Sequence, residues 1–377
     1  MTVNFVLTEN AIAPSSVTPI SNVAILPAAN RAVAVLSPIN PADCAEWDTF
    51  GTAHPHHSIF HSAAWAKVLE KTYGFSPVYF IAGEKKNPSA ILPLMEVNSW
   101  LTGRRGVALP FTDDCEPLFS DAAAAKNLMQ AALEFGKRRG WKSIEWRGGR
   151  ELFDDAPASL SFYGHSVNLE ANEDELFARL ESSVRRAIRK AEKGGVTASV
   201  SNSLDSIKMF YSLQCRTRRK HGLPPQPFVF FQNIYEQILS KDLGVIVSAS
   251  HEGRPIAASV YFQLGKQAVY KYGAVDEAFQ HLRGANLVMW KAIQWLARRG
   301  AKTLHLGRTS LSNEGLRRFK LGWGAAEQKI EYIKYDLRKN CFVTDGDEAV
   351  GWHNRVFRLL PMGLSRVIGA VLYRHWA

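Results

Sequence analysis

The segments GKRRGWKSIEWRGG at 136–149 and LARRGAKTLHLGRT at 296–309 carry one pattern twice. Each has Arg-Arg-Gly-x-Lys in the same register, followed by a run rich in hydrophobic residues. Basic residues before a glycine are typical of the last turn of a helix, where cations suit the helix dipole and glycine takes a left-handed conformation. We therefore expect one joint of helix, glycine and strand in two places. Its arginines are interpreted as helix caps rather than ligand contacts: Arg138, Arg139, Arg298 and Arg299.

The elements around the two joints repeat as well. Before and at the first joint, periodicity predicts a strand at 31–36, helices at 43–50 and 62–74, strands at 78–83, 89–97 and 105–111, a helix at 122–140 and a strand at 142–146. Around the second joint it predicts a strand at 165–170, helices at 174–195, 203–222 and 230–241, strands at 244–253, 254–265 and 267–276, a helix at 285–300 and a strand at 302–307. We therefore expect an α/β protein with mixed sheets and two domains of the same fold.

Chain length and composition agree with a two-domain protein. The chain has 377 residues, of which 46% are hydrophobic and 21% charged. We expect a loosely ordered lead-in at 1–30, a first domain at 31–165, a second domain at 166–337, and a basic amphipathic segment at 338–377. The lead-in is mostly small and uncharged, which is typical of a segment without a packed core.

Other features limit the class of protein. The cysteines lie too far apart for a zinc or disulfide motif, which indicates a reducing compartment: Cys44, Cys115, Cys215 and Cys341. No apolar run of about 18 residues and no export signal is visible, so we expect a cytoplasmic protein. The net charge of +11 favours an anionic partner, although a basic chain is also an ordinary soluble state.

The predicted element order is that of the GCN5-related N-acetyltransferase (GNAT) fold, and two such domains in tandem resemble the Fem family of aminoacyl transferases. SSVRRAIRKAEKGGV at 182–196 resembles a Fem-type segment, and GANLVMWKAIQWLARRGAKTLHLGRTS with LRRFKLGWG, within 284–324, resembles a bacterial Fem-like subgroup. That subgroup is associated with exopolysaccharide and exosortase (PEP-CTERM) gene clusters. The sequence departs from that pattern in two places: His305 and Leu306 stand where Asp-Phe is expected, and Thr309 replaces Ser. The coiled-coil insertion of the aminoacyl-tRNA enzymes is also absent.

The resemblance implies the catalytic residues. Lys320 matches the lysine of the Phe-Lys motif, which stabilises negative charge on the donor or the transition state; a solvated lysine is the alternative. Tyr272 lies on the strand where backbone donors would meet the acyl group. Together with Asp276 and His305 it is also a weak candidate for the general base.

The donor-binding residues are expected at a helix N-terminus. QHLRGAN at 280–286 partly matches the acetyl-CoA loop, so Gly284 and Asn286 are predicted to bind the donor diphosphate, with an ordinary turn and cap as the equal alternative. Arg308 leaves the tip of a strand and is predicted to contact phosphate. We expect no tightly bound cofactor; acyl-CoA or aminoacyl-tRNA would be a donor substrate.

Five arginines are candidates for substrate binding. The helix at 182–193 has basic faces that in most proteins are simply solvated. Arg219 stands in a segment that resembles a Fem turn whose arginine meets a nucleotide-sugar diphosphate. The substrate-binding predictions are Arg185, Arg189, Arg219, Arg317 and Arg318.

Two further segments attract functional hypotheses. HPHHSIFHSAAW at 54–65 holds four histidines but no nearby carboxylate, so we expect packing and no metal. The segment 355–377 alternates apolar residues with arginine and carries no acid, so it either docks on the domains or touches an anionic membrane at its inner face.

Three functions remain open at this point. The leading hypothesis is an acyl- or aminoacyltransferase acting on an amine of a cell-envelope or exopolysaccharide precursor, with a nucleotide- or lipid-linked sugar acceptor in the cleft between the domains. The alternatives are an acetyl-CoA-dependent N-acetyltransferase of a small amine and a non-catalytic basic module that binds RNA or membrane.

Overall fold

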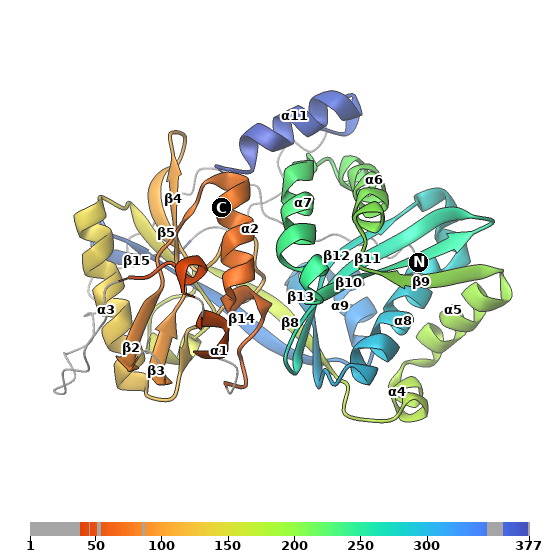
Figure 1. Ribbon diagram of the computed structural model, residues 1–377, viewed down its shortest axis with the longest axis horizontal. Coiled ribbons are helices and arrows are strands. Elements are labelled where there is room, and N and C mark those ends of the chain that lie inside the picture. The colour runs from red at the N-terminus through yellow and green to blue at the C-terminus, as the bar shows by residue number, and fades with distance from the viewer. Residues whose placement is uncertain (1–37, 45, 51–53, 85–86, 345–356, 376–377) are drawn as a thin grey trace. The chain divides into compact units, whose positions relative to one another are not determined.

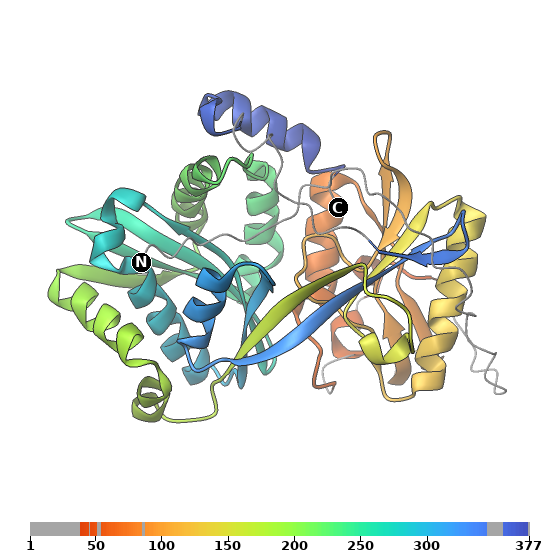
Figure 2. The ribbon, with the colours of Figure 1, turned by 180° about the vertical axis from the view of Figure 1, so that it is seen from behind.

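The computed structural model describes residues 38–44, 46–50, 54–84, 87–344 and 357–375 (Figure 1). The predicted lead-in at 1–30 and the predicted strand at 31–36 lie outside the described residues. Chain contacts divide the protein into two compact units. The N-terminal unit holds the described residues up to 162 together with 330–344 and 372–375, and the C-terminal unit holds 163–329 and 357–371. Strands β8 (Leu160–Asn168) and β14 (Ala326–Asp336) each carry residues of both units (Figure 2).

The N-terminal unit contains two sheets and three α-helices among its described residues. Its helices are α1 (Trp47–Phe50), α2 (Ala63–Tyr73) and α3 (Ala122–Arg139). Its strands, besides the two shared ones, are β1 (Ser76–Pro77), β2 (Phe80–Glu84), β3 (Asn87–Leu92), β4 (Met95–Ser99), β5 (Gly103–Val107), β6 (Leu118–Phe119), β7 (Ser143–Arg147) and β15 (Cys341–Val343). The sheet orders are β1-β4-β5-β7-β14, with β15 on β14, and β2-β3-β6. Helix α3 contributes a buried face of alanine, leucine and methionine to the core of this unit.

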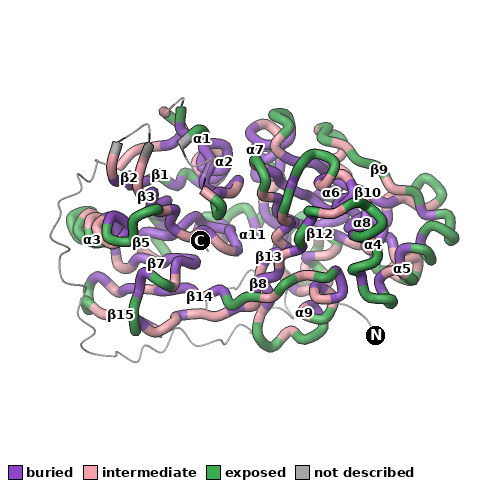
Figure 3. The backbone as a smooth tube through the Cα atoms, turned by 90° about the horizontal axis from the view of Figure 1, so that it is seen from below, coloured by how far each residue is buried: buried purple, intermediate pink, exposed green. Residues whose placement is uncertain are grey.

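The C-terminal unit is built around one sheet. Its helices are α4 (Glu173–Arg179), α5 (Ser182–Lys193), α6 (Leu204–Lys220), α7 (Phe228–Gln237), α8 (Gly284–Arg298), α9 (Glu314–Leu321) and α11 (Met362–Leu372). Its own strands are β9 (Val196–Ser201), β10 (Gly244–His251), β11 (Arg254–Leu264), β12 (Gln267–Val275) and β13 (Thr303–Ser310), and the order is β14-β8-β13-β12-β11-β10-β9. The central strands are almost wholly buried, whereas exposed residues follow β9 and one face of α5 (Figure 3).

The repeated joint is present in both units, with the same hydrogen bonds. Gly140 and Gly300 have φ of 70° and 80°, values that suit glycine at a helix C-terminus. After each glycine a lysine enters the sheet: Lys142 N–H donates to Arg104 O at 2.8 Å, and Lys302 N–H donates to Lys266 O at 2.8 Å. The carbonyls of the same two lysines accept from Leu337 at 2.9 Å and Leu169 at 2.8 Å respectively.

The two strands that follow the joints also hold equivalent places. Strand β7 pairs in parallel with β5, and β13 pairs in parallel with β12. On its other side β7 meets β14, and β13 meets β8. The predicted α/β class with mixed sheets is therefore confirmed, and so is the equivalence of the two strands.

Three predicted elements are wrong in their extent. The strand predicted at 89–97 is two strands in different sheets, β3 and β4, separated by Pro93, which has no N–H to donate to a ladder. The helix predicted at 174–195 breaks into α4 and α5, and at the break the N–H of Glu181 donates to Gly322 O at 2.9 Å. The strand predicted at 105–111 ends at Val107, and Leu109 and Phe111 then adopt positive φ.

Candidate functional site

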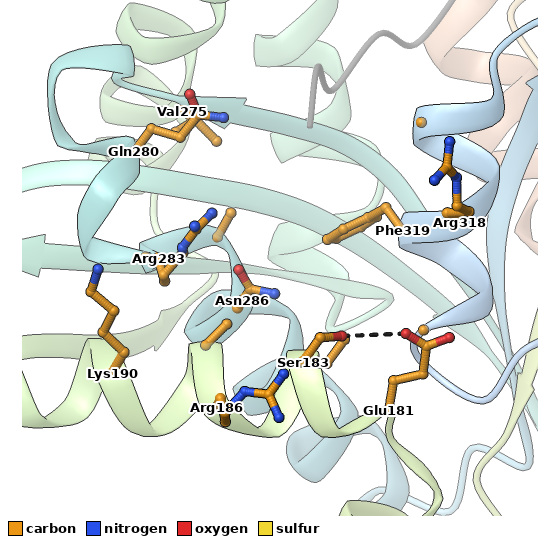
Figure 4. Close-up of a pocket in the computed structure, with 16 residues that line it drawn as sticks. Glu181, Ser183, Arg186, Lys190, Val275, Gln280, Arg283, Asn286, Arg318 and Phe319 are labelled. Carbon is orange, nitrogen blue, oxygen red and sulfur yellow. Dashed lines mark hydrogen bonds between the residues drawn. The ribbon is translucent and has the colours of Figure 1, made fainter. Parts of the chain in front are cut away.

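A pocket of about 720 Å³ opens in the C-terminal unit (Figure 4). Three elements surround it: the first turns of α5, the N-terminus of α8 with the turn before it, and α9. The residues that line it are Glu181, Ser183, Val184, Arg186, Ala187, Lys190, Val275, Gln280, Arg283, Gly284, Ala285, Asn286, Gly315, Arg318, Phe319 and Gly322.

The N-terminus of α8 lacks a side-chain cap. Arg283 is the N-cap residue, with φ of 61°, and its side chain makes no capping hydrogen bond. Gly284 follows, where an added Cβ would lie 3.0 Å from Ile256 Cδ1, so the first turn of the helix approaches the sheet closely. Free N–H groups and the helix dipole make such a terminus favourable for a bound anion.

The corresponding helix of the N-terminal unit is capped. The Asp121 side chain accepts from the N–H of Ala123 at 2.9 Å at the start of α3. The carboxylate supplies both the hydrogen bond and the negative charge that an anionic ligand would bring. The geometry that favours a bound anion is therefore present at the N-terminus of α8 and not at that of α3.

Positive charge surrounds the pocket at α8. Arg186 and Lys190 project from α5, Arg318 lies on α9, and Arg283 stands at the helix start. None of these four side chains forms an ion pair with any residue that the structure describes. One carboxylate, Glu181, lines the same pocket, and it accepts from the Ser183 hydroxyl at 3.3 Å. The pocket therefore favours a ligand with several negative charges.

The sheet opens beside this pocket. Strand β12 pairs with β13 only from Gln267 to Val269, and beyond that point no pairing joins the two strands. The free part of β12 contains a bulge opposite Val260 and Tyr261 and ends at Val275, in the pocket lining. At Gly273 an added Cβ would lie 1.9 Å from the Tyr270 hydroxyl, so only glycine fits there. The separated strands expose backbone edge groups to an extended ligand.

Three of the predicted site residues line this pocket: Gly284, Asn286 and Arg318. The sequence analysis missed Arg186, Lys190 and Arg283, which line it as well. On α5 the buried residues are Val184, Ile188 and Ala191, and their register turns positions 186 and 190 toward α8. From the spacing along the helix, Arg186 and Lys190 lie on one face of α5 and Arg185 and Arg189 on another. The sequence did not indicate which of these faces lines the pocket.

Five of the six arginines predicted to bind substrate or phosphate lie outside the pocket lining. Arg189 stacks over the Phe177 ring at 5.4 Å, and Arg219 Nε donates to Arg358 O at 3.4 Å. Arg185 on α5 and Arg308 on β13 are also absent from the lining. The structure therefore brings only some of the predicted site residues together at the pocket.

Arg317 is held in an ion pair. Its Nε and Nη2 donate to the two carboxylate oxygens of Glu327 at 2.7 and 2.8 Å, and its guanidinium lies over the Tyr163 ring at 4.4 Å. The hydrogen bond from Arg317 lowers the pKa of Glu327, and the same pair raises the pKa of Arg317. This geometry ties α9 to β14 and β8, and Arg317 is not among the residues that line the pocket.

Lys320 is buried and holds a strand. Its side chain is 2% exposed, and Nζ donates to Gly307 O at 2.8 Å and to Arg308 O at 3.0 Å. Both carbonyls belong to β13, on the part that has separated from β12. Beside it His165 is fully buried, and burial and the charge of Lys320 lower the pKa of that imidazole. Lys320 itself does not line the pocket.

The three weak candidates for a general base have structural contacts. Tyr272 is 2% exposed, and its ring packs on Phe231 with centroids 5.5 Å apart. Asp276 pairs with Arg216 at 3.1 Å and Arg254 at 2.9 Å. His305 Nδ1 accepts from the N–H of Gly307 at 3.1 Å. None of the three lines the pocket.

The histidine segment is buried in the N-terminal unit from His57 onward apart from the half-buried Ser58, whereas Pro55 and His56 are exposed. His61 is 2% exposed, its Nε2 lies 3.0 Å from Glu116 O, and its Nδ1 accepts from the N–H of Ser58 at 3.1 Å. Burial lowers the pKa of His61 to about 3 and that of His57 to about 4. Among the residues that the structure describes, no three histidine, cysteine, aspartate or glutamate side chains are grouped to hold a metal ion.

Acidification should destabilise the N-terminal unit through His61. Its pKa in the folded protein is far below 6.5, so the unfolded chain binds the proton first and stability falls as pH drops from 6.5 toward 3. Each pH unit in this window should cost about 1.4 kcal/mol. We expect calorimetric melting curves between pH 7 and 5 to show a smaller loss of stability in His61→Gln than in wild type. Equal slopes in the two proteins would contradict the assignment.

No helix within the described parts of the chain is long and apolar enough to cross a bilayer.

Comparison with known proteins places this geometry in a known fold. Residues 178–321 match the family model of the acetyltransferase (GNAT) domain, and a search of curated proteins finds no match. A crystal structure of FemX is similar with a TM-score of 0.64 at 15% identity, over 81% of this chain and 98% of that one.

Two further solved structures have a similar fold. One is the C-terminal domain of a putative lysylphosphatidylglycerol synthetase from Agrobacterium fabrum, with a TM-score of 0.50 at 14% identity over 76% of this chain and 89% of that one. The other is a tandem GNAT protein from the clavulanic acid biosynthesis pathway, with a TM-score of 0.50 at 9% identity over 80% of this chain and 98% of that one. At these identities the likeness shows the fold, which is that of a tandem GNAT protein.

Proposed function

We propose that the protein is a GNAT-type N-acyltransferase whose donor, an acyl-CoA, binds in the pocket at the start of α8. The observation that carries the proposal is the uncapped N-terminus of α8, surrounded by four cationic side chains without an acidic partner among the described residues. A nucleotide diphosphate offers several negative charges in a small volume, which suits such a terminus. The match of residues 178–321 to the GNAT domain supports the same donor.

The separated strands provide a path for the rest of the donor. The diphosphate would accept hydrogen bonds from the first N–H groups of α8, and Arg186 and Lys190 would balance its charge. The extended arm of the donor would lie along the free edge of β12, which ends at Val275 in the pocket. Its thioester would then lie between β12 and β13.

The transfer step requires no covalent enzyme intermediate. The acceptor amine attacks the thioester carbonyl carbon, a C–N bond forms, the C–S bond breaks, and the thiol leaves with a proton that the amine gives up. The rate acceleration would come from positioning of the two reactants and from hydrogen-bond donors aimed at the developing oxyanion. Lys320 would act in this step by holding the β13 carbonyls at Gly307 and Arg308, and so the shape of the strand opening.

The acceptor that we propose is an amine of a cell-envelope or exopolysaccharide precursor. The sequence resemblance of 182–196 and 284–324 to the Fem-like subgroup supports it. A small free amine is the alternative acceptor, and an aminoacyl ester of tRNA is the alternative donor. The tandem fold is compatible with each, so ligand experiments must separate them.

Thermal melting with donor candidates tests the proposal. At a concentration of about 100 times Kd, acetyl-CoA should stabilise the C-terminal unit by about 2.7 kcal/mol, or about 5–10 °C in Tm. Pantetheine, which has no nucleotide diphosphate, is the matched control and should give almost no shift. If aminoacyl-tRNA raised Tm and no acyl-CoA did, the donor would be aminoacyl-tRNA instead of acyl-CoA. No shift with either would overturn the proposed function.

A further inference from the structure

Helix α11 presents three of its large apolar residues to solvent, while Met362, Ile368 and Leu372 are half-buried. Ser365 and Gly369 are buried, whereas Leu364, Val367 and Val371 are 48, 61 and 53% exposed. Positions 364, 367 and 371 lie on one face of a helix because they are three and four residues apart. A helix that packs on a domain core normally has the opposite orientation, with its large apolar residues buried.

This orientation is fixed by close packing. An added Cβ at Gly369 would lie 2.0 Å from Pro225 O, so α11 approaches the turn between α6 and α7 at a point where only glycine fits. Arg366 lies over the Tyr211 ring at 5.3 Å, and a hydrogen bond with Cys215 raises the pKa of its guanidinium. In Figure 1 the helix lies across the ends of α6 and α7. Ser365 and Gly369 therefore lie on the docking face of α11, and Leu364 and Val371 lie on the exposed side. Val367 is exposed as well and borders a groove that Tyr211 and Phe228 also line.

Exposed apolar side chains are concentrated in this segment. The described residues include nine large hydrophobic side chains that are exposed, and four of them lie between 357 and 371. Besides the three on α11, Leu359 is 82% exposed. Because scattered single residues are normal on a protein surface while a cluster marks a contact site, this face needs a partner.

The charge of the segment identifies the kind of partner. Between Phe357 and His375 the chain has arginine at 358, 366 and 374 and no aspartate or glutamate. Arg358 is exposed next to Leu359. An apolar face bordered by cations is the pattern of a helix that lies in the interface of an anionic bilayer.

We propose that α11 docks on the surface of an anionic lipid bilayer, with Leu364, Val367 and Val371 inserted between the headgroups and Arg358 on the lipid phosphates. The inference goes beyond the proposed acyl transfer and does not depend on it, since the donor pocket is lined by α5, α8 and α9. It would bring an enzyme of this kind to lipid-linked acceptors.

Vesicle co-sedimentation of the full chain tests the proposal. The protein should bind vesicles of phosphatidylcholine with phosphatidylglycerol, and bind vesicles of phosphatidylcholine alone much less. The triple variant Leu364→Ser/Val367→Ser/Val371→Ser should lose about tenfold or more in partition coefficient. Arg358→Gln should weaken binding to the anionic vesicles alone, and added salt should reduce that difference.

Matched controls exclude general effects of apolar exposure and of misfolding. Val200→Ser/Val229→Ser removes two side chains that are 40 and 46% exposed elsewhere in the same unit, and should bind vesicles as wild type does. Since the three α11 side chains are exposed, the triple variant should keep its Tm and its response to acetyl-CoA.

Two outcomes would overturn the proposal. The first is equal vesicle binding by wild type and the triple variant. The second is a wild-type protein that ignores vesicles but forms dimers in light scattering, which the triple variant abolishes. That result would assign the face to a second copy of this chain.

Discussion

Arg283→Asp should lower the affinity for acetyl-CoA about a hundredfold or more, the largest effect expected of any single change in the pocket. Arg283 is the N-cap residue of α8, and its positive φ of 61° is one that aspartate tolerates better than most residues. The new carboxylate would cap the helix from within, as Asp121 does on α3, and would place a negative charge where the diphosphate binds.

Isothermal titration calorimetry with acetyl-CoA measures this loss of affinity. Three matched variants separate the effect of charge from that of helix capping. Arg283→Gln removes the cation without adding a cap and should lower the affinity for acetyl-CoA about tenfold. At high salt this difference from wild type should largely disappear, because salt screens the attraction of the arginine. Arg283→Asn adds a neutral cap, and its affinity for acetyl-CoA should lie between those of Arg283→Asp and Arg283→Gln. Asp121→Asn changes the equivalent cap of the N-terminal unit and should leave the affinity unchanged.

The result that would contradict this site is wild-type affinity in Arg283→Asp with a normal melting curve. The donor would then bind elsewhere. A gain in affinity in Asp121→Asn would instead indicate that the donor binds at α3, because that change removes a negative charge from the start of this helix.

The repeated joint could be predicted because its signal is local. A glycine that takes positive φ after a basic helical turn specifies its own backbone, and Gly140 and Gly300 do so without help from distant residues. Strand β14 was missed although Ile330, Tyr332, Ile333 and Tyr335 on it are buried. Its partners β7 and β8 come from remote parts of the chain, and no local pattern records such pairing.

Part of the pocket lining could be predicted from a backbone feature. Gly284 and Asn286 were predicted there because a glycine-containing turn before a helix is a recognisable anion-site signal, and both line the pocket. Among the predicted arginines only Arg318 lines the pocket. The sequence of a basic helix shows which residues share a face, but not which element that face contacts. Arg317 illustrates this: its partner Glu327 lies on another element, and the sequence gives no sign that the two meet.

Lys320→Met should lower the free energy of unfolding of the C-terminal unit by about 2–4 kcal/mol, because the Gly307 and Arg308 carbonyls would lose a charged donor in a buried place. Urea denaturation measures this loss. We also expect kcat for acyl transfer to fall about a hundredfold at a temperature where both proteins are fully folded, since β13 would no longer be held opposite the free part of β12.

The affinity for acetyl-CoA distinguishes a positioning residue from a donor-binding one. Lys320 does not line the pocket, so Kd should change less than about twofold in Lys320→Met while kcat falls. Lys320→Arg keeps the charge and several N–H donors, so it should lose less unfolding free energy and less kcat than Lys320→Met. Arg318→Met is the internal comparison: its side chain lines the proposed donor pocket, so the change should raise KM and leave kcat near wild type.

Each outcome assigns Lys320 differently. A fall in stability with normal kcat would leave the lysine a purely structural role. A fall in kcat that Lys320→Arg restores, with Kd unchanged, would place it in the reaction through the strand that it holds. Unchanged stability and unchanged kcat in Lys320→Met would contradict both roles, and catalysis would then rest on the backbone of β12 and β13 alone.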